Sequence, residues 1–226
     1  MSHLADNSQL WAVLLADIVD SRKLRERRAE VQQRALDLVD AVNRELPGRL
    51  RVPLALSGGD EVQGLLRRPA DAVAVMDALD LGAGGFRWRF AVGWGAVTTA
   101  FRPTTFQMDG DCFREARAAL ERARREKRWA AAGGFGKEAD RVLDGVLAGA
   151  GVIRRDWTER QRQAIRVRRR HASLTAAAAD LGVVPSTMSK MLKAAHAREL
   201  AELEAALAAL LDRFAAAAGG GKGETG

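Results

Sequence analysis

The first 66 residues alternate between strand-like and helix-like hydrophobic patterns. Residues 11–22 begin with a nearly continuous apolar run, typical of a strand buried on both faces, and end in carboxylates. Residues 23–46 carry apolar positions at helical spacing, and Pro47 and Gly48 end that pattern. Residues 49–66 contain two apolar runs around a Ser-Gly-Gly-Asp-Glu tip, which predicts a β-hairpin.

Residues 70–95 add a second helix and a further strand. Pro69 precedes a helix predicted at 70–81, and the glycines that follow stop it. Residues 86–95 alternate bulky apolar residues with basic or small ones, as a strand with one face on the core does. The order β-α-β-β-α-β predicts an α+β, ferredoxin-like domain, in which two helices cover one face of an antiparallel sheet.

Residues 98–151 are predicted to be a loop followed by helices. The loop at 98–111 precedes a strongly basic helix at about 112–129. The glycine-rich segment 133–137 lacks the spacing of a phosphate-binding P-loop and is expected only to connect that helix to a short one ending near 147. The small residues at 148–151 give the best domain boundary, so residues 1–150 are expected to form the α/β domain.

The remaining residues have a helical pattern throughout. Helices are predicted at 158–169, after a Thr158–Gln161 capping box, at 173–181 and at 185–195. The short turn at Gly182 gives the last two the spacing of a helix-turn-helix. A long amphipathic helix at 198–218 carries an apolar stripe expected to pair two copies of the chain. Residues 151–218 are therefore expected to form an all-α DNA-binding domain with a dimerisation helix, followed by a disordered tail at 219–226.

Composition and charge narrow the class of protein. The chain has 226 residues, a formal net charge of +7 and a sequence pI near 10.4, which favours a polyanionic partner. Its single cysteine, Cys112, excludes an internal disulfide and a multi-thiolate metal site, and three scattered histidines make a zinc centre a poor expectation. No apolar run approaches membrane-spanning length and no secretory pattern is visible, so a cytoplasmic protein that contacts no membrane is expected.

Acidic residues at the end of the first strand and on the hairpin tip form the first candidate site. If the two strands are neighbours, Asp17 and Asp60 converge, with Glu61 beside them. Paired carboxylates near a backbone turn suit Mg²⁺ bound to a nucleotide phosphate. The alternative is that Asp60 and Glu61 are ordinary turn residues, because Asp and Gly favour hairpins on their own account. Asp20 is better explained as a helix cap.

Basic residues of the helix at 112–129 form a candidate phosphate site. Arg114 and Arg117 are three residues apart, so they share a helix face and could clamp a phosphate. The alternative is a solvated basic face without a ligand.

The predicted helix-turn-helix supplies the candidate DNA-binding residues. The helix that begins at Pro185 would place its first residues in the major groove, and upstream arginines would contact the DNA backbone. The candidate DNA-binding residues are Ser186, Thr187, Ser189, Lys190, Lys193, Arg168, Arg169 and Arg170. The alternative is a helical hairpin that makes dimer contacts.

Several of these segments resemble the SatD family of bacterial proteins. The resembling phrases are residues 16–22, 57–66, 89–95 and 109–117. The resemblance extends to the helix-turn-helix and implies a nucleotide-cyclase-like or palm-like core joined to a DNA-binding module.

The cyclase comparison carries over to particular residues. Asp17 and Asp60 look like the metal-binding aspartates of class III nucleotide cyclases, and residues 58–61 look like the hairpin of GGDEF-type cyclases. Arg117 is similar to the cyclase arginine that stabilises the transition state, yet no Asn stands in 110–117, and no purine-selecting Lys and Asp pair is found. The resemblance therefore implies metal and phosphate binding with turnover lost.

These expectations combine into one function and two rivals. The expected protein is a homodimeric, DNA-binding transcriptional regulator whose cyclase-like domain binds a nucleotide or phosphate ligand with Mg²⁺. The main rival is an active, metal-dependent nucleotidyl cyclase or nucleotidyltransferase that makes a signalling nucleotide. The third possibility is a structural adaptor with an inactive cyclase core.

Overall fold

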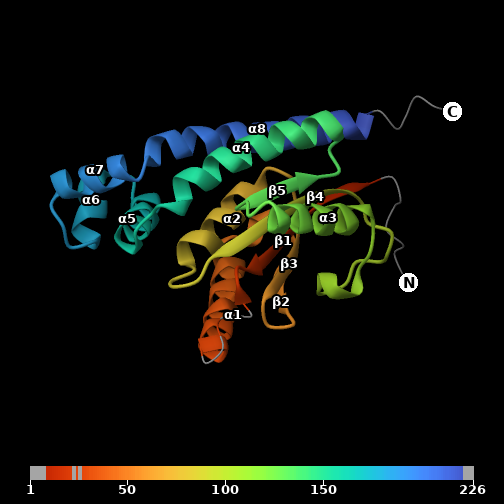
Figure 1. The fold of residues 1–226 in the computed structure, drawn as a ribbon, viewed down its shortest axis with the longest axis horizontal. Helices are drawn as coiled ribbons and strands as arrows, with labels where there is room; N and C mark the ends of the chain where they lie inside the picture. Colours follow the sequence, from red (N-terminus) through yellow and green to blue (C-terminus); the bar gives the residue numbers. More distant parts are fainter. Residues whose placement is uncertain (1–8, 22–23, 25–26, 221–226) are drawn as a thin grey trace.

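A five-stranded mixed sheet forms the centre of the computed structural model, which describes residues 9–21, 24 and 27–220 (Figure 1). The strand order is β2-β3-β1-β4-β5, in which β5 is parallel to β4 and every other neighbouring pair is antiparallel. The predicted α+β class and the β-α-β-β-α-β order of the first half are confirmed. The strands are β1 (Leu10–Ile18), β2 (Leu50–Ser57), β3 (Glu61–Leu66), β4 (Trp88–Ala96) and β5 (Ala130–Gly133).

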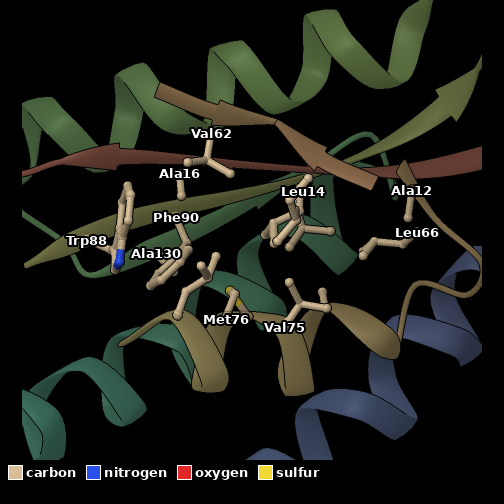
Figure 2. Packing of buried hydrophobic residues seen from close by; sticks show 14 of the residues in the cluster. Ala12, Leu14, Ala16, Val62, Leu66, Val75, Met76, Trp88, Phe90 and Ala130 are labelled. Atoms are coloured by element: carbon tan, nitrogen blue, oxygen red, sulfur yellow. The ribbon is translucent and has the colours of Figure 1, made fainter. Parts of the chain in front are cut away.

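Helices cover both faces of this sheet. α1 (Arg28–Glu45) and α2 (Asp71–Gly82) lie on one face, where Figure 2 shows Val75 and Met76 facing Leu14 and Phe90. α3 (Asp111–Arg125) covers the other face and packs on alternate residues of β1 such as Leu15. Because β1 is covered on both sides, its apolar run is nearly continuous.

Strand β5 was not predicted from the sequence. The basic helix expected at 112–129 ends at Arg125, and residues 130–133 pair with β4. Lys127 has a positive φ of 54°, which a helix interior does not accommodate. The prediction was wrong because alanine favours helices locally, whereas the open edge of β4 offers hydrogen bonds that only the folded chain supplies.

Helices α4 (Lys137–Arg155) and α8 (Ala197–Gly220) lie side by side along one edge of the molecule (Figure 1). Leu207 and Leu211 of α8 are buried in the same core as Leu143 and Leu147 of α4. The apolar stripe expected to pair two chains is therefore buried within one chain. The helix expected to end near 147 continues to Arg155, so the predicted boundary at 148–151 falls inside α4.

Three short helices, α5 (Glu159–Arg170), α6 (Leu174–Asp180) and α7 (Pro185–Ala194), pack on one another around a small core of their own. The predicted capping box at Thr158 and Gln161 opens α5. Gly182, with a φ of 67°, lies in the turn between α6 and α7, where the left-handed conformation favours glycine. Gly219 and Gly220 belong to α8, and the rest of the predicted disordered tail lies outside the described residues.

Within the residues that the structure describes, no helix is both long enough and apolar enough to span a membrane.

Candidate functional site

The three candidate acids lie at one end of the sheet. Asp17 near the end of β1 is the register partner of Glu61 at the start of β3, so their side chains share the face that α3 covers. Asp60 precedes Glu61, and its backbone carbonyl accepts a hydrogen bond from the Ile18 amide at 3.0 Å. The expected convergence of the two strand ends is therefore present.

Each acid already has a partner from the chain. Asp17 is buried, with 7% of its surface exposed, and its Oδ2 atom lies 2.9 Å from Nη2 of Arg124 and 3.5 Å from Nη1 of Arg89. Asp60 accepts a hydrogen bond from the Ser21 hydroxyl at 2.6 Å. Glu61 lies 3.3 Å from Nη2 of Arg117. Only Asp17 Oδ1 is buried without a hydrogen-bond partner among these groups.

These contacts test whether the acids fit the predicted Mg²⁺. A divalent cation held by Asp17 would have to compete with two guanidinium groups for the same carboxylate. In the described part of the chain, no three His, Cys, Asp or Glu residues are grouped so that they could hold a metal ion. As placed, the Asp17 carboxylate is already bound by two guanidinium groups and does not fit a divalent metal ligand, and we assign no metal chemistry to it.

Arginines line the same end of the sheet. Arg117 and Arg124 lie seven residues apart on α3, and Arg89 faces Asp17 across β1 and β4. The hydrogen bond that Arg124 donates to the Asp17 carboxylate raises the pKa of Arg124. Arg114 is half-exposed near the start of α3 and is paired with Asp111 and Asp109. The sequence interpretation missed Arg89 and Arg124; the helical spacing of Arg124 from Arg117 was the available signal.

The candidate DNA-binding side chains of α7 are exposed. Met188 is fully buried in the core that α7 shares with α5 and α6, and Met191 and Leu192 are partly buried beside it. The exposed polar residues of α7 are Ser186, Thr187, Ser189, Lys190 and Lys193. α7 therefore has one face on its neighbouring helices and one face of polar and basic residues.

The three candidate arginines of α5, unlike the exposed side chains of α7, are each bound to other groups of the chain. Arg168 donates to the backbone carbonyl of His171 at 2.6 Å. Arg169 forms hydrogen bonds with Asp77 and Glu204, and Arg170 lies 3.7 Å from Glu45. Arg169 and Arg170 therefore face the α/β half of the molecule, and we leave both out of any DNA interface.

A buried ionic cluster joins this helical part to the rest of the chain. Arg154 of α4 is only 2% exposed, and its guanidinium contacts Asp77 at 2.8 Å and Asp80 at 3.1 Å. We call the following residues the junction cluster: Arg154, Arg162, Arg169, Asp77, Asp80 and Glu204. They come from α2, α4, α5 and α8, so this cluster fixes the position of α5 on α2.

Aromatic rings and opposite charges stabilise the junction cluster. The Arg154 guanidinium lies 4.7 Å from the ring of Trp129 and 5.2 Å from the ring of Trp157. Burial opposes its charge, but the neighbouring carboxylates outweigh burial and raise the pKa of Arg154. Burial and nearby Asp77 raise the pKa of Glu204. The sequence signal was the pair Asp77 and Asp80, three residues apart in a helix whose other residues after Asp71 are apolar or glycine.

Comparisons with known proteins complete the description. Residues 11–200 match the SatD family. Among solved structures, a bacterial light-regulated adenylyl cyclase has 13% sequence identity and a TM-score of 0.42; the match covers 55% of this chain and 43% of the cyclase chain. The GGDEF domain of YfiN from Pseudomonas aeruginosa has 18% identity and a TM-score of 0.38, with 57% and 84% covered.

These structural similarities are low, with both TM-scores below 0.5. The match spans less than half of the cyclase chain. No curated protein matched this chain.

Proposed function

Since the chain belongs to the SatD family, we propose that it is a DNA-binding transcriptional regulator whose α/β half binds a phosphate-bearing ligand such as a nucleotide. The observation that carries the DNA-binding part is the exposed polar and basic face of α7, a helix held from behind by α5 and α6.

The packing of α5, α6 and α7 supports a helix-turn-helix. Residues 181–184 separate α6 from α7, and Gly182 allows the sharp turn. In such modules the second helix of the motif enters the major groove with its N-terminal residues foremost. In this chain, those residues are Ser186, Thr187, Ser189 and Lys190, whose side chains can meet base edges or phosphates.

The charge of the chain supports a polyanionic partner. The net charge of +7 gives the phosphate attraction that dominates affinity for nucleic acid. Lys190 and Lys193 place positive charge on the exposed face of α7 itself. Arg168 donates a hydrogen bond to the His171 carbonyl, and we infer that its guanidinium also contacts a DNA phosphate beside the major groove.

The ligand part of the proposal depends on the arginines of α3. Arg117 is 62% exposed beside Glu61, and Arg114 is 60% exposed one turn earlier, so both can turn toward a phosphate. Mg²⁺ is left out because Asp17 faces Arg89 and Arg124. The same two ion pairs weigh against the active cyclase, which would need that carboxylate for metal.

DNA binding is tested by fluorescence anisotropy with a labelled random duplex over a salt series. We expect affinity to fall steeply between about 50 and 200 mM salt, because bound cations are released from DNA. Lys190→Ala should weaken binding and reduce the slope of log K against log salt by about 1. Lys137→Ala, which removes an exposed lysine of α4, is the matched control and should change neither.

A flat salt response, or equal effects of Lys190→Ala and Lys137→Ala, would contradict the DNA-binding proposal. The ligand part is tested separately by thermal shift with ATP in the presence of EDTA. We expect stabilisation that Arg117→Ala diminishes; no stabilisation of the parent protein would contradict this part.

A further inference from the structure

A groove lies where the helical part meets the α/β half. It has a volume of about 640 Å³ and is lined by residues of α1, α2 and α5. Figure 1 shows α5 beside α2 at this junction. Small-molecule sites are commonly about 300–1,000 Å³ and often lie between domains. The groove therefore has the size and place of a ligand site, and none of the residues considered above for phosphate or DNA lines it except Arg169 and Arg170.

The floor of the groove is apolar. Its apolar lining includes Leu38 and Ala41 of α1 and Ala78 and Leu81 of α2. Leu81 is 5% exposed, and the other three side chains are partly buried. An occupant with an apolar body would remove this surface from water, which is favourable by roughly 25 cal/mol per Å².

The α5 side of the groove is basic. Arg166, Arg169 and Arg170 lie at positions i, i+3 and i+4 and thus on one face of α5. Arg169 is held by Asp77 and Glu204, whereas the ion pair of Arg170 with Glu45 is long, at 3.7 Å. In the described part of the chain, Arg166 has no ion-pair partner within 4.0 Å. Its charge is therefore available to an occupant of the groove.

Acidic residues of the lining do not cancel that charge. Asp77 is already paired with Arg154 and Arg169, and the lining carries four arginines against three carboxylates. Glu45 is 58% exposed and only distantly paired. An anionic group near Arg166 could also replace Glu45 at Arg170, since a guanidinium binds carboxylate, sulfonate and phosphate groups with two parallel hydrogen bonds.

We propose that this groove binds a small amphipathic anion, whose apolar body lies on Leu38, Ala41 and Ala78 and whose anionic group pairs with Arg166 and Arg170. This site is separate from the DNA-binding face of α7 and from the arginines of α3. Its occupancy can be measured on the protein alone, so its test does not depend on DNA binding.

The test uses isothermal titration calorimetry of the full chain with three probes. Naphthalene-2-sulfonate carries an apolar body and a charge, naphthalene-2-sulfonamide has the same shape without the charge, and inorganic sulfate has the charge alone. We expect the sulfonate to bind at least about tenfold more tightly than the sulfonamide, because only the sulfonate carries a charge that pairs with the arginines. Sulfate alone should show no saturable binding.

Matched variants locate the binding. Arg166→Ala should lower sulfonate affinity toward that of the sulfonamide, with Arg170 keeping part of the difference, while Arg160→Ala, which removes an exposed arginine of α5 outside the groove, should leave it unchanged. Ala78→Phe fills the floor and should weaken both aromatic probes. Equal binding of the two aromatic probes, an Arg166→Ala effect no larger than that of Arg160→Ala, or no saturable binding at all would each overturn the proposal.

Discussion

The guanidinium of Arg154 shows how this protein stabilises a buried charge. It is almost completely removed from water, and carboxylates from two other helices offset the loss of hydration. Arg162 and Arg169 balance the charge of the same carboxylates. The cluster is neutral as a set, so each member depends on the others.

Arg154→Ala should lower the free energy of unfolding by about 3–5 kcal/mol, because it leaves buried carboxylates without a partner. Urea denaturation followed by circular dichroism measures this. The neighbouring Arg155, 63% exposed and paired with the exposed Asp156, provides the control, and Arg155→Ala should change stability by less than about 0.5 kcal/mol. Similar losses for the two variants would show that the cluster does not stabilise the fold.

Cys112 should be chemically inert in the folded chain. Burial against the sheet raises the pKa of its thiol to about 12, so at pH 8 about one thiol in 10⁴ is ionised. Iodoacetamide labelling followed by mass spectrometry should find little modification of the native protein and complete modification in urea. Rapid native labelling at pH 8 would contradict this burial.

The same thiol contributes to pH dependence in the alkaline range. Its ordinary pKa is 9.0, so between about pH 9 and pH 12 the unfolded chain loses this proton and the folded chain keeps it. The contribution of Cys112 to stability is therefore full below pH 9 and is lost as pH rises through that window.

The candidate acids show what sequence could predict about the site. Alternating apolar runs that end in carboxylates were enough to place Asp17 beside the hairpin tip, and the register of β1 with β3 agrees. The partner of Asp17 could not be predicted in that way, because Arg124 lies 107 residues later in the sequence, on the helix that covers this face of the sheet. Local pattern gives the position of a charge, whereas its neutralisation depends on tertiary packing.

At the scale of elements, the contact between α3 and β4 is unusually close. A Cβ atom added at Gly93 would lie 2.1 Å from the backbone oxygen of Cys112 and 2.3 Å from the amide nitrogen of Ala116. The helix therefore rests on the backbone of the strand, and glycine is needed at this position for its small size.

Gly93→Ala should destabilise the fold by about 1–3 kcal/mol or more, because α3 would have to move away from the sheet. Gly145→Ala is the matched control: nothing lies within 4 Å of its added Cβ, and alanine in the middle of α4 should stabilise by about 0.5–1 kcal/mol. Thermal unfolding of both variants decides the matter, and shifts of the same sign would contradict this account of Gly93.

Elements with a strong local period were the ones that sequence predicted best. α1, α2 and the three short helices α5 to α7 appear where their patterns place them. β5 and the burial of α8 were missed, because both depend on a partner distant in sequence: the edge of β4 for one and α4 for the other. Amphipathicity shows that α8 must bury a stripe, but it does not say against what.

At the scale of the whole molecule, α8 packs its apolar side chains into the main core of the α/β half. Leu211→Ala should reduce the free energy of unfolding by about 2–5 kcal/mol, because it opens a cavity in the core shared with α4. Arg213→Ala, at an exposed position of the same helix, should have little effect. Urea titrations at two protein concentrations make the measurement.

The concentration series also addresses the dimer expected from the sequence. If α8 packs within one chain, the urea midpoint should not depend on protein concentration, and Leu211→Ala should not change the sedimentation coefficient of the native protein. A midpoint that rises with concentration would instead indicate that α8 joins two chains.

Because α4 is one continuous helix, its length determines how the three short helices are rotated relative to the sheet. Each residue of an α-helix turns its successors by about 100° and advances them by about 1.5 Å. One residue inserted between Leu147 and Arg154 would swing Arg154 away from the carboxylates of α2 and would rotate the three short helices as a block. An insertion or deletion in this helix would therefore keep the orientation of α7 relative to the sheet only when its length is close to a whole number of turns.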